Sequence, residues 1–186
     1  MRNWMIPAVL MAFTWGAQAQ SFKLESPDLK YEGTFGIEQV FDGFGCTGAN
    51  VSPALSWKSP PADTKSFALL VHDPDAPTGG SGWWHWVMID IPATVTALPK
   101  GAGKSDGTAA PTGARQITTD FGTAGWGGPC PPEGDRAHRY NFTLYALKVE
   151  KLEVPPNSSA ALVGYMVNAN ALGKASFSGM YGRKKP

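Results

Sequence analysis

Short apolar runs, each ended by turn-forming residues, recur along this chain. Residues 66–72 read Ser-Phe-Ala-Leu-Leu-Val-His and stop at Asp73-Pro74. A run of this length, without helical spacing, is typical of a strand that is covered on both faces. Residues 84–91 and 139–149 repeat the pattern. These three runs predict the main strands of a sheet, which we expect to be antiparallel. Shorter runs at 22–25, 36–41, 54–58 and 175–181 predict further strands.

One late segment has the spacing of a helix. Within residues 158–172, apolar side chains recur at intervals of three and four positions, and a stripe of this kind normally faces the core. Its members are Leu162, Tyr165, Met166, Ala169 and Leu172. We expect the stripe to pack on the sheet and residues 183–186 to form a frayed tail. Many strands and a single helix predict an all-β dominated fold, a sandwich with one late helix.

Composition excludes several classes of protein. The 186 residues include 22 glycines and 16 prolines, which argues against a helical bundle. Lysine and arginine number 16 against 15 aspartates and glutamates, so no broad basic field exists to bind nucleic acid by charge. The length favours one domain, predicted to span residues 20–186.

The first nineteen residues resemble a cleavable leader. Arg2 precedes a mostly apolar stretch from Met5 to Trp15, and Ala17-Gln18-Ala19 places small residues at a cleavage site. A transmembrane anchor is the poorer alternative, because a helix this short reaches only about half of a bilayer core. We therefore interpret residues 1–19 as a signal peptide and expect a periplasmic or secreted protein.

Export changes the interpretation of the two cysteines. Cys46 and Cys130 lack the CxxC spacing of a metal or redox motif. A structural disulfide is the better interpretation in an oxidising compartment, and two unpaired buried thiols are the alternative.

Three histidines supply the main candidate chemistry. His72 leads into Asp73-Pro74-Asp75-Ala76-Pro77, where two prolines stiffen a turn that holds two carboxylates. In a strand from Trp84, His85 would share one face with Val87 and Ile89. Each feature also has a purely structural interpretation: an ordinary turn at a strand end, and a core histidine bonded to a carbonyl.

The third candidate segment, residues 127–140, combines glycines, prolines and the pair His138 and Tyr140. Positions i and i+2 of a strand face the same way, so these two side chains would project together. Imidazoles, a phenol and exposed backbone amides suit an oxyanion such as phosphate or carboxylate. Asp73 would then orient a histidine or accept a hydrogen bond from the ligand.

In combination, residues 73–77, 83–86 and 127–140 resemble the two signature regions of the phosphatidylethanolamine-binding protein family. Residues 50–57 are similar to its bacterial branch, the Raf kinase inhibitor-like YbhB/YbcL proteins. The resemblance implies a Greek-key β-sandwich of two antiparallel sheets with a small anion pocket at one end. The pocket residues that it implies are Asp73, Pro77, His85, His138 and Tyr140, with Trp83 and Gly128 at the rim or wall.

This chain departs from the mammalian pattern, in which two consecutive histidines stand where Trp84-His85 stands here. One donor is replaced by an indole, so the resemblance implies an anion site but does not establish the headgroup preference of the family. The leading hypothesis is a binding protein for a small anionic or phosphorylated ligand, without a cofactor. Inhibition of a partner protein is an activity that the family resemblance implies.

The competing hypothesis is a hydrolase. It would use His85 or His138 as general base with Asp73, and possible metal ligands are His72, Asp73, His85 and His138. No Gly-x-Ser-x-Gly motif or HExxH spacing supplies a nucleophile or a metal site. The sequence therefore favours binding over catalysis.

Overall fold

The computed structural model describes residues 21–29 and 33–185, and the predicted leader 1–19 falls outside them. Within these residues the chain forms β1 (Lys23–Glu25), β2 (Asp42–Gly43), β3 (Cys46–Thr47), β4 (Leu55–Lys58), β5 (Ser66–Asp73), β6 (Trp83–Pro92), β7 (Ala97–Leu98), β8 (Arg115–Gln116), β9 (His138–Leu147), α1 (Ala160–Asn170) and β10 (Ala171–Tyr181). No helix in the described residues combines the length and the apolar character needed to cross a membrane.

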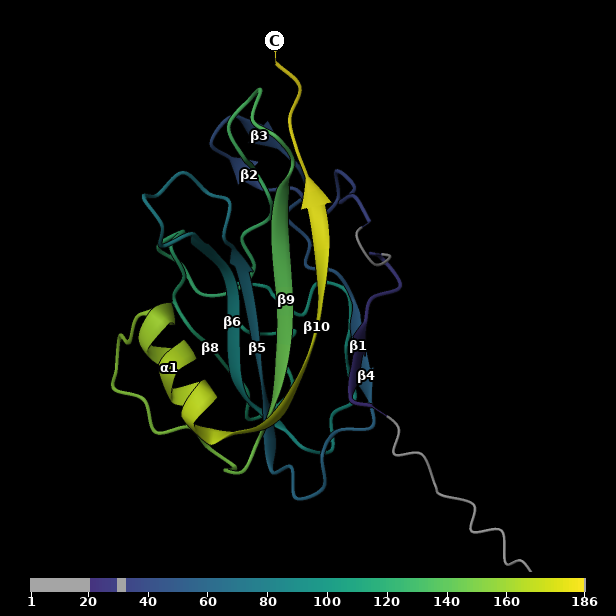
Figure 1. Cartoon of the computed structure of the whole chain (residues 1–186), viewed down its shortest axis with the longest axis vertical. Helices are drawn as coiled ribbons and strands as arrows, with labels where there is room; N and C mark the ends of the chain where they lie inside the picture. The colour runs from purple at the N-terminus through teal and green to yellow at the C-terminus, as the bar shows by residue number, and fades with distance from the viewer. Residues whose placement is uncertain (1–20, 30–32, 186) are drawn as a thin grey trace, which may run out of the picture.

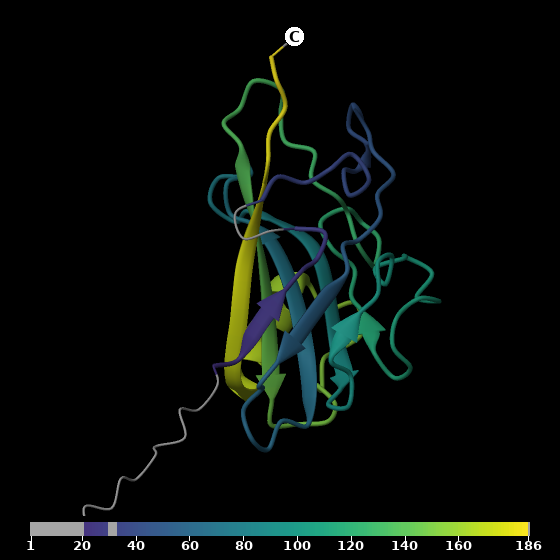
Figure 2. The ribbon, with the colours of Figure 1, turned by 90° about the vertical axis from the view of Figure 1, so that its right-hand side faces the viewer.

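Two sheets and the helix form three layers. The large sheet has the strand order β10-β9-β5-β6-β8, the small sheet has the order β1-β4-β7, and β2 and β3 form a separate ribbon. Neighbouring strands of all three are antiparallel. The small sheet covers one face of the large sheet and α1 covers the other (Figures 1 and 2). The predicted mostly-β fold with one late helix is confirmed.

The strand order explains how distant segments meet. In the large sheet, β9 returns beside β5, so β9-β5-β6-β8 is a Greek-key arrangement. Strand β5 is covered on both faces, as its apolar run predicts. Its Phe67, Leu69 and Val71 lie in the core beneath the small sheet, while Ala68 and Leu70 lie in the core beneath α1.

The strand expected at residues 36–41 does not form. This segment turns instead, and its backbone is closed by a hydrogen bond from Gln39 N to Gly36 O at 3.1 Å. The Gln39 side chain also accepts a hydrogen bond from the Gly36 backbone, so local side-chain bonding replaces strand pairing here.

The helix exists, but its predicted core face is wrong. The buried residues are Ala160, Val163, Gly164 and Val167. Leu162 is 41% exposed and Tyr165 is 70% exposed, and Leu172 lies beyond the helix at the start of β10. Both stripes have helical spacing, so periodicity alone could not choose between them. The buried stripe consists of small and β-branched residues, and at Gly164 the helix lies close to Leu70 of β5: an added Cβ would be 3.5 Å from that side chain.

A matched pair of substitutions tests this correction. Val163→Asp should lower the free energy of unfolding by several kcal/mol, because it buries an unpaired carboxylate. Leu162→Asp, one position away on the exposed face, should change it by less than about 1 kcal/mol. Urea unfolding of both variants measures the difference. An equal loss of unfolding free energy in both variants would mean that the Leu162 side of α1 also packs on the sheet.

Candidate ligand-binding site

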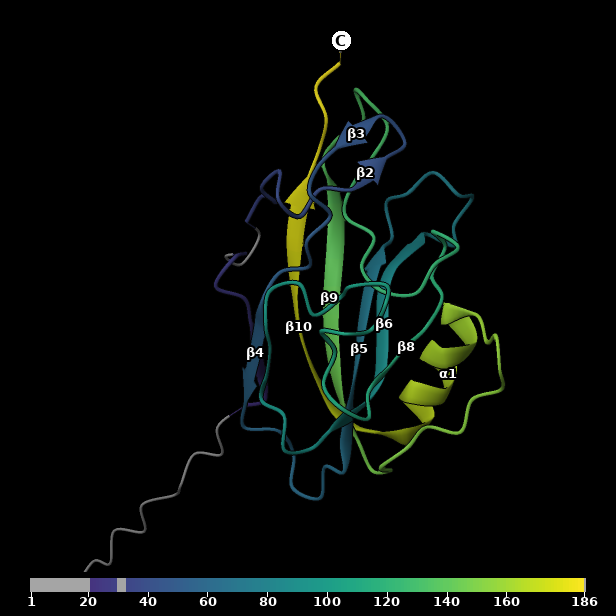
Figure 3. The ribbon, with the colours of Figure 1, turned by 180° about the vertical axis from the view of Figure 1, so that it is seen from behind.

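A cavity of about 330 Å³ lies at one end of the large sheet. Strand β5 ends there, β6 and β9 begin there, and β10 ends there, with the β2–β3 ribbon alongside (Figure 3). The residues that line it are Phe44, Asp73, Ala76, Pro77, Thr78, Trp83, His85, Phe121, Cys130, Pro131, Pro132, His138, Tyr140 and Arg183. Six of the seven predicted ligand-binding residues are therefore brought together, and Gly128 is the exception.

His85 reaches the cavity because β6 contains a bulge. Strand β5 pairs His72 with Trp84 and Val71 with Trp86, which leaves His85 as an extra residue between two paired positions. The predicted alternation, with His85 on the face of Val87, is therefore wrong. The His85 ring lies with its centroid 4.9 Å from that of Tyr140, on the face that looks toward the small sheet.

Burial keeps the His85 ring neutral. Its Nδ1 donates to the Gly127 carbonyl at 2.6 Å, so Nδ1 carries the proton and Nε2 carries a lone pair. Loss of solvent lowers the pKa of His85 to about 4, against the opposing effects of the Gly127 hydrogen bond and the Asp73 charge. Near neutral pH, His85 therefore offers an acceptor to a ligand.

Asp73 and His138 form a buried pair. His138 Nδ1 donates to Asp73 Oδ2 at 2.8 Å, and both side chains are almost fully buried. The other ring nitrogen, Nε2, lies 3.5 Å from the Asp135 carboxylate. His138 also lines the cavity, so this buried pair fixes one part of the cavity wall.

Asp75 fixes the turn that follows β5 to the start of β9. Its carboxylate accepts from Arg139 Nε and Nη2, both at 2.8 Å, and from Arg136 Nη2 at 2.7 Å. These hydrogen bonds, led by those from Arg139, hold the pKa of Asp75 well below its usual range. The second carboxylate of the motif thus positions the cavity wall instead of facing a ligand.

Tyr140 lines the cavity, and its buried hydroxyl has no hydrogen-bond partner among the described residues. The residue is fully buried, and its Oη and Trp57 Nε1 are the two buried side-chain polar atoms without a hydrogen bond in the described part of the chain. Trp57 belongs to the core between the sheets, whereas Tyr140 lines the cavity beside His138, as predicted from their shared strand face. Burial raises the Tyr140 pKa, so the hydroxyl stays protonated and can donate.

Gly128 is a packing residue. Its N–H donates to Asn50 Oδ1 at 2.8 Å and is not available to a ligand. A Cβ at this position would overlap the backbone of Gln39, Val40 and Phe41. Close approach of two backbone segments therefore explains this glycine.

Four residues that line the cavity lie outside the segments singled out from sequence: Phe44, Thr78, Phe121 and Arg183. Phe44 and Phe121 stack at 6.0 Å from loops far apart in the chain, and Phe121 also contacts the rings of Trp83 and His85. No motif marks either phenylalanine. Arg183 was expected in a frayed tail, yet its side chain is held by the β2–β3 ribbon and by Pro131.

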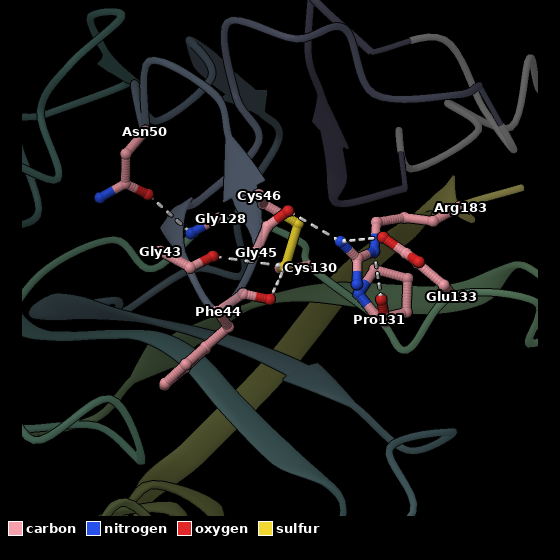
Figure 4. Close-up of a disulfide and its surroundings, with 10 residues drawn as sticks. All are labelled: Gly43, Phe44, Gly45, Cys46, Asn50, Gly128, Cys130, Pro131, Glu133 and Arg183. Carbon is pink, nitrogen blue, oxygen red and sulfur yellow. Dashed lines mark hydrogen bonds and ion pairs between the residues drawn. A yellow bond between two sulfur atoms is a disulfide. The ribbon is translucent and has the colours of Figure 1, made fainter. Parts of the chain in front are cut away.

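The Cys46–Cys130 disulfide is present and lies at the cavity wall (Figure 4). It joins the β2–β3 ribbon to the segment that precedes β9, so two walls of the cavity are covalently connected. No group of three or more histidine, cysteine, aspartate or glutamate side chains among the described residues could hold a metal ion.

Comparison with known proteins identifies the family. The family model described as phosphatidylethanolamine-binding protein matches residues 26–182 of this chain. The chain belongs to the phosphatidylethanolamine-binding protein family. Membership supports the binding of a small ligand in general.

The chain is similar to two bacterial members of this family. YbcL of Escherichia coli is 52% identical over 97% of this chain and 98% of its own length. YbhB of the same organism is 46% identical over 86% of this chain and 99% of its own length. The crystal structure of YbcL, described as a new member of the mammalian PEBP family, matches with a TM-score of 0.84 and 55% identity. That match covers 87% of this chain and 98% of the solved chain.

Because His85 of this PEBP-family protein is buried in its neutral form, the free energy of unfolding should depend on pH. The ordinary pKa of histidine is about 6.5, and that of folded His85 is about 4, so the unfolded chain binds the proton first as pH falls. Neutral His85 therefore makes its full contribution to the free energy of unfolding above pH 6.5. As the pH falls toward 4, this contribution of about 3 kcal/mol is lost. Urea unfolding at several pH values should give a flatter profile for His85→Gln than for the parent.

The matched control is His72→Gln, which changes a partly exposed histidine on the neighbouring strand. This variant should keep the steep profile of the parent between pH 6.5 and 4.5. A His85→Gln profile parallel to that of the parent would show that His85 is not buried in its neutral form.

Proposed function

We propose that this protein is an exported binding protein, and not an enzyme, whose cavity takes the phosphate or carboxylate group of a small ligand. The observation that carries the proposal is that Tyr140, a residue of the cavity lining, has a buried hydroxyl without a hydrogen-bond partner among the described residues. An unpaired buried polar group costs about 1 to 3 kcal/mol, and a ligand oxygen that accepts its hydrogen bond would remove that cost.

The polar groups of the cavity fit a partly protonated oxyanion. Tyr140 donates through its hydroxyl and neutral His85 accepts through Nε2, while His138 lines the cavity beside them. A phosphate monoanion presents both acceptor oxygens and a hydroxyl, and a protonated ligand amine would also suit His85. The aromatic side chains beside these groups would contact the apolar part of a larger ligand.

Catalysis is the weaker interpretation of the same groups. The buried Asp73–His138 pair resembles the orienting half of a hydrolytic triad. A nucleophile would have to come from the same cavity, where Cys130 is oxidised in the disulfide and the Thr78 hydroxyl donates to Gly82 O. We therefore propose ligand binding, extended to inhibition of a partner protein as the family resemblance implies.

The sharpest test of ligand binding removes one oxygen atom. Tyr140→Phe should weaken the binding of inorganic phosphate, measured by titration calorimetry, roughly tenfold to a hundredfold, because a hydrogen bond to an anion is lost. The same substitution should leave the melting temperature unchanged or higher, since no protein hydrogen bond is broken. Tyr145→Phe, on the same strand but in the core beneath α1, should keep the parent affinity.

Two results would contradict this assignment. Unchanged phosphate affinity in Tyr140→Phe would remove the hydroxyl from the site. A large fall in melting temperature, with phosphate bound by neither parent nor variant, would give Tyr140 a purely structural role.

Export is supported by the apolar leader and by the disulfide, a bond typical of oxidising compartments.

Expression of the full chain in a bacterium tests export. Mass analysis without reductant should find the protein outside the cytoplasm, beginning at Gln20 and carrying the Cys46–Cys130 bond. A chain that keeps residues 1–19 and stays in the cytoplasm would rule out the leader.

A further inference from the structure

Arg183 stands where the C-terminal strand passes the cavity. Tyr181, the last residue of β10, pairs with His138 at the start of β9. Two positions further on, Arg183 forms a parallel bridge with Glu133 and lines the cavity. Its side chain is only 17% exposed. The end of the chain therefore carries a guanidinium group into the wall of the site.

The hydrogen bonds of this guanidinium leave one nitrogen unused. Nε donates to Pro131 O at 2.8 Å, and Nη1 donates to Gly45 O at 2.9 Å and lies 3.2 Å from the Glu133 carboxylate. No hydrogen bond to a described residue uses Nη2, which carries two N–H groups. Figure 4 shows the group between the β2–β3 ribbon, the disulfide and the Pro131–Glu133 segment.

The charges at this end of the sheet are matched in pairs, and the partner of Arg183, the half-exposed Glu133, does not line the cavity. Asp73 bonds to His138, and Asp75 bonds to the exposed guanidinium groups of Arg136 and Arg139. Of the described residues that line the cavity, Arg183 alone is a lysine or an arginine. An anion in the cavity would therefore find its permanent counter-charge at Arg183.

We propose that Arg183 determines specificity by binding the anionic group of the ligand through Nη2. The assignment rests on the proposed function and deepens it, because it selects ligands by negative charge. Two backbone carbonyls already hold the guanidinium in place, so little side-chain entropy is lost when an anion binds. A lysine would keep the charge but not the planar fork that these contacts orient.

The direct test observes Arg183 in the unmodified mature protein. The side-chain nitrogens of arginine are labelled with ¹⁵N, and inorganic phosphate is titrated while NMR spectra are recorded. The Arg183 resonances, identified by their absence in Arg183→Lys, should shift with the same dissociation constant as calorimetry gives. A residue that only supports the fold would not titrate with the ligand.

Calorimetry on variants measures the size of the effect. Arg183→Gln should weaken phosphate binding roughly tenfold to a hundredfold, and Arg183→Lys should fall between it and the parent. The control is Lys184→Gln, which removes the same charge from the exposed neighbour and should stay within about twofold of the parent. If Arg183→Gln does not fold, the NMR titration and Arg183→Lys still decide the matter.

The role of Arg183 and the proposed binding function can be refuted separately. Phosphate binding that depends on Tyr140, with no Arg183 shift and an unchanged affinity in Arg183→Gln, would overturn the role of Arg183 and leave the proposed function intact. No phosphate binding by the parent would overturn both. An equal loss of affinity in Lys184→Gln would reduce the effect to general surface charge.

Discussion

The buried hydrogen bond between His138 and Asp73 closes the end of the large sheet where β5 and β9 meet. The two residues are 65 positions apart in the chain. The pairing of β5 with β9 brings His138 Nδ1 to 2.8 Å from Asp73 Oδ2. A carboxylate without this partner would be a buried, uncompensated charge, so the strand register and the bond require each other. The bond also fixes the His138 ring in the cavity wall, and it sets the position of Tyr140 two residues further along β9.

Local charge pairing determines what the cavity can bind. Asp73 and Asp75 are matched by His138 and by two arginines, and burial keeps His85 neutral. Hydrogen-bonding capacity remains at the Tyr140 hydroxyl, at His85 Nε2 and at Arg183 Nη2, so the cavity combines donors with an acceptor inside an aromatic rim. This combination suits an oxyanion that still carries a proton, whereas a site made only of cations would favour a fully charged one.

The parts that were predicted correctly from sequence depend on local rules. The apolar run of β5 identifies a strand covered on both faces, and the i to i+2 spacing of His138 and Tyr140 identifies their shared face. The disulfide follows from two cysteines and a leader. The Greek-key arrangement and the cavity residues came from the family resemblance, which local patterns alone would not have provided.

The errors share a cause in tertiary packing. A bulge turns His85 to the other face, and α1 buries a stripe of small and β-branched residues instead of the more apolar one. Gly128 serves backbone packing, while Arg183 is held by carbonyls more than fifty positions away. None of these contacts leaves a local pattern, because each depends on a segment distant in sequence.

A crystal structure determined with phosphate tests the central claim most directly. The account predicts a tetrahedral anion in the cavity, with one oxygen within hydrogen-bond distance of Tyr140 Oη. A cavity that holds only waters at saturating phosphate, with Tyr140 bonded to one of them, would contradict it.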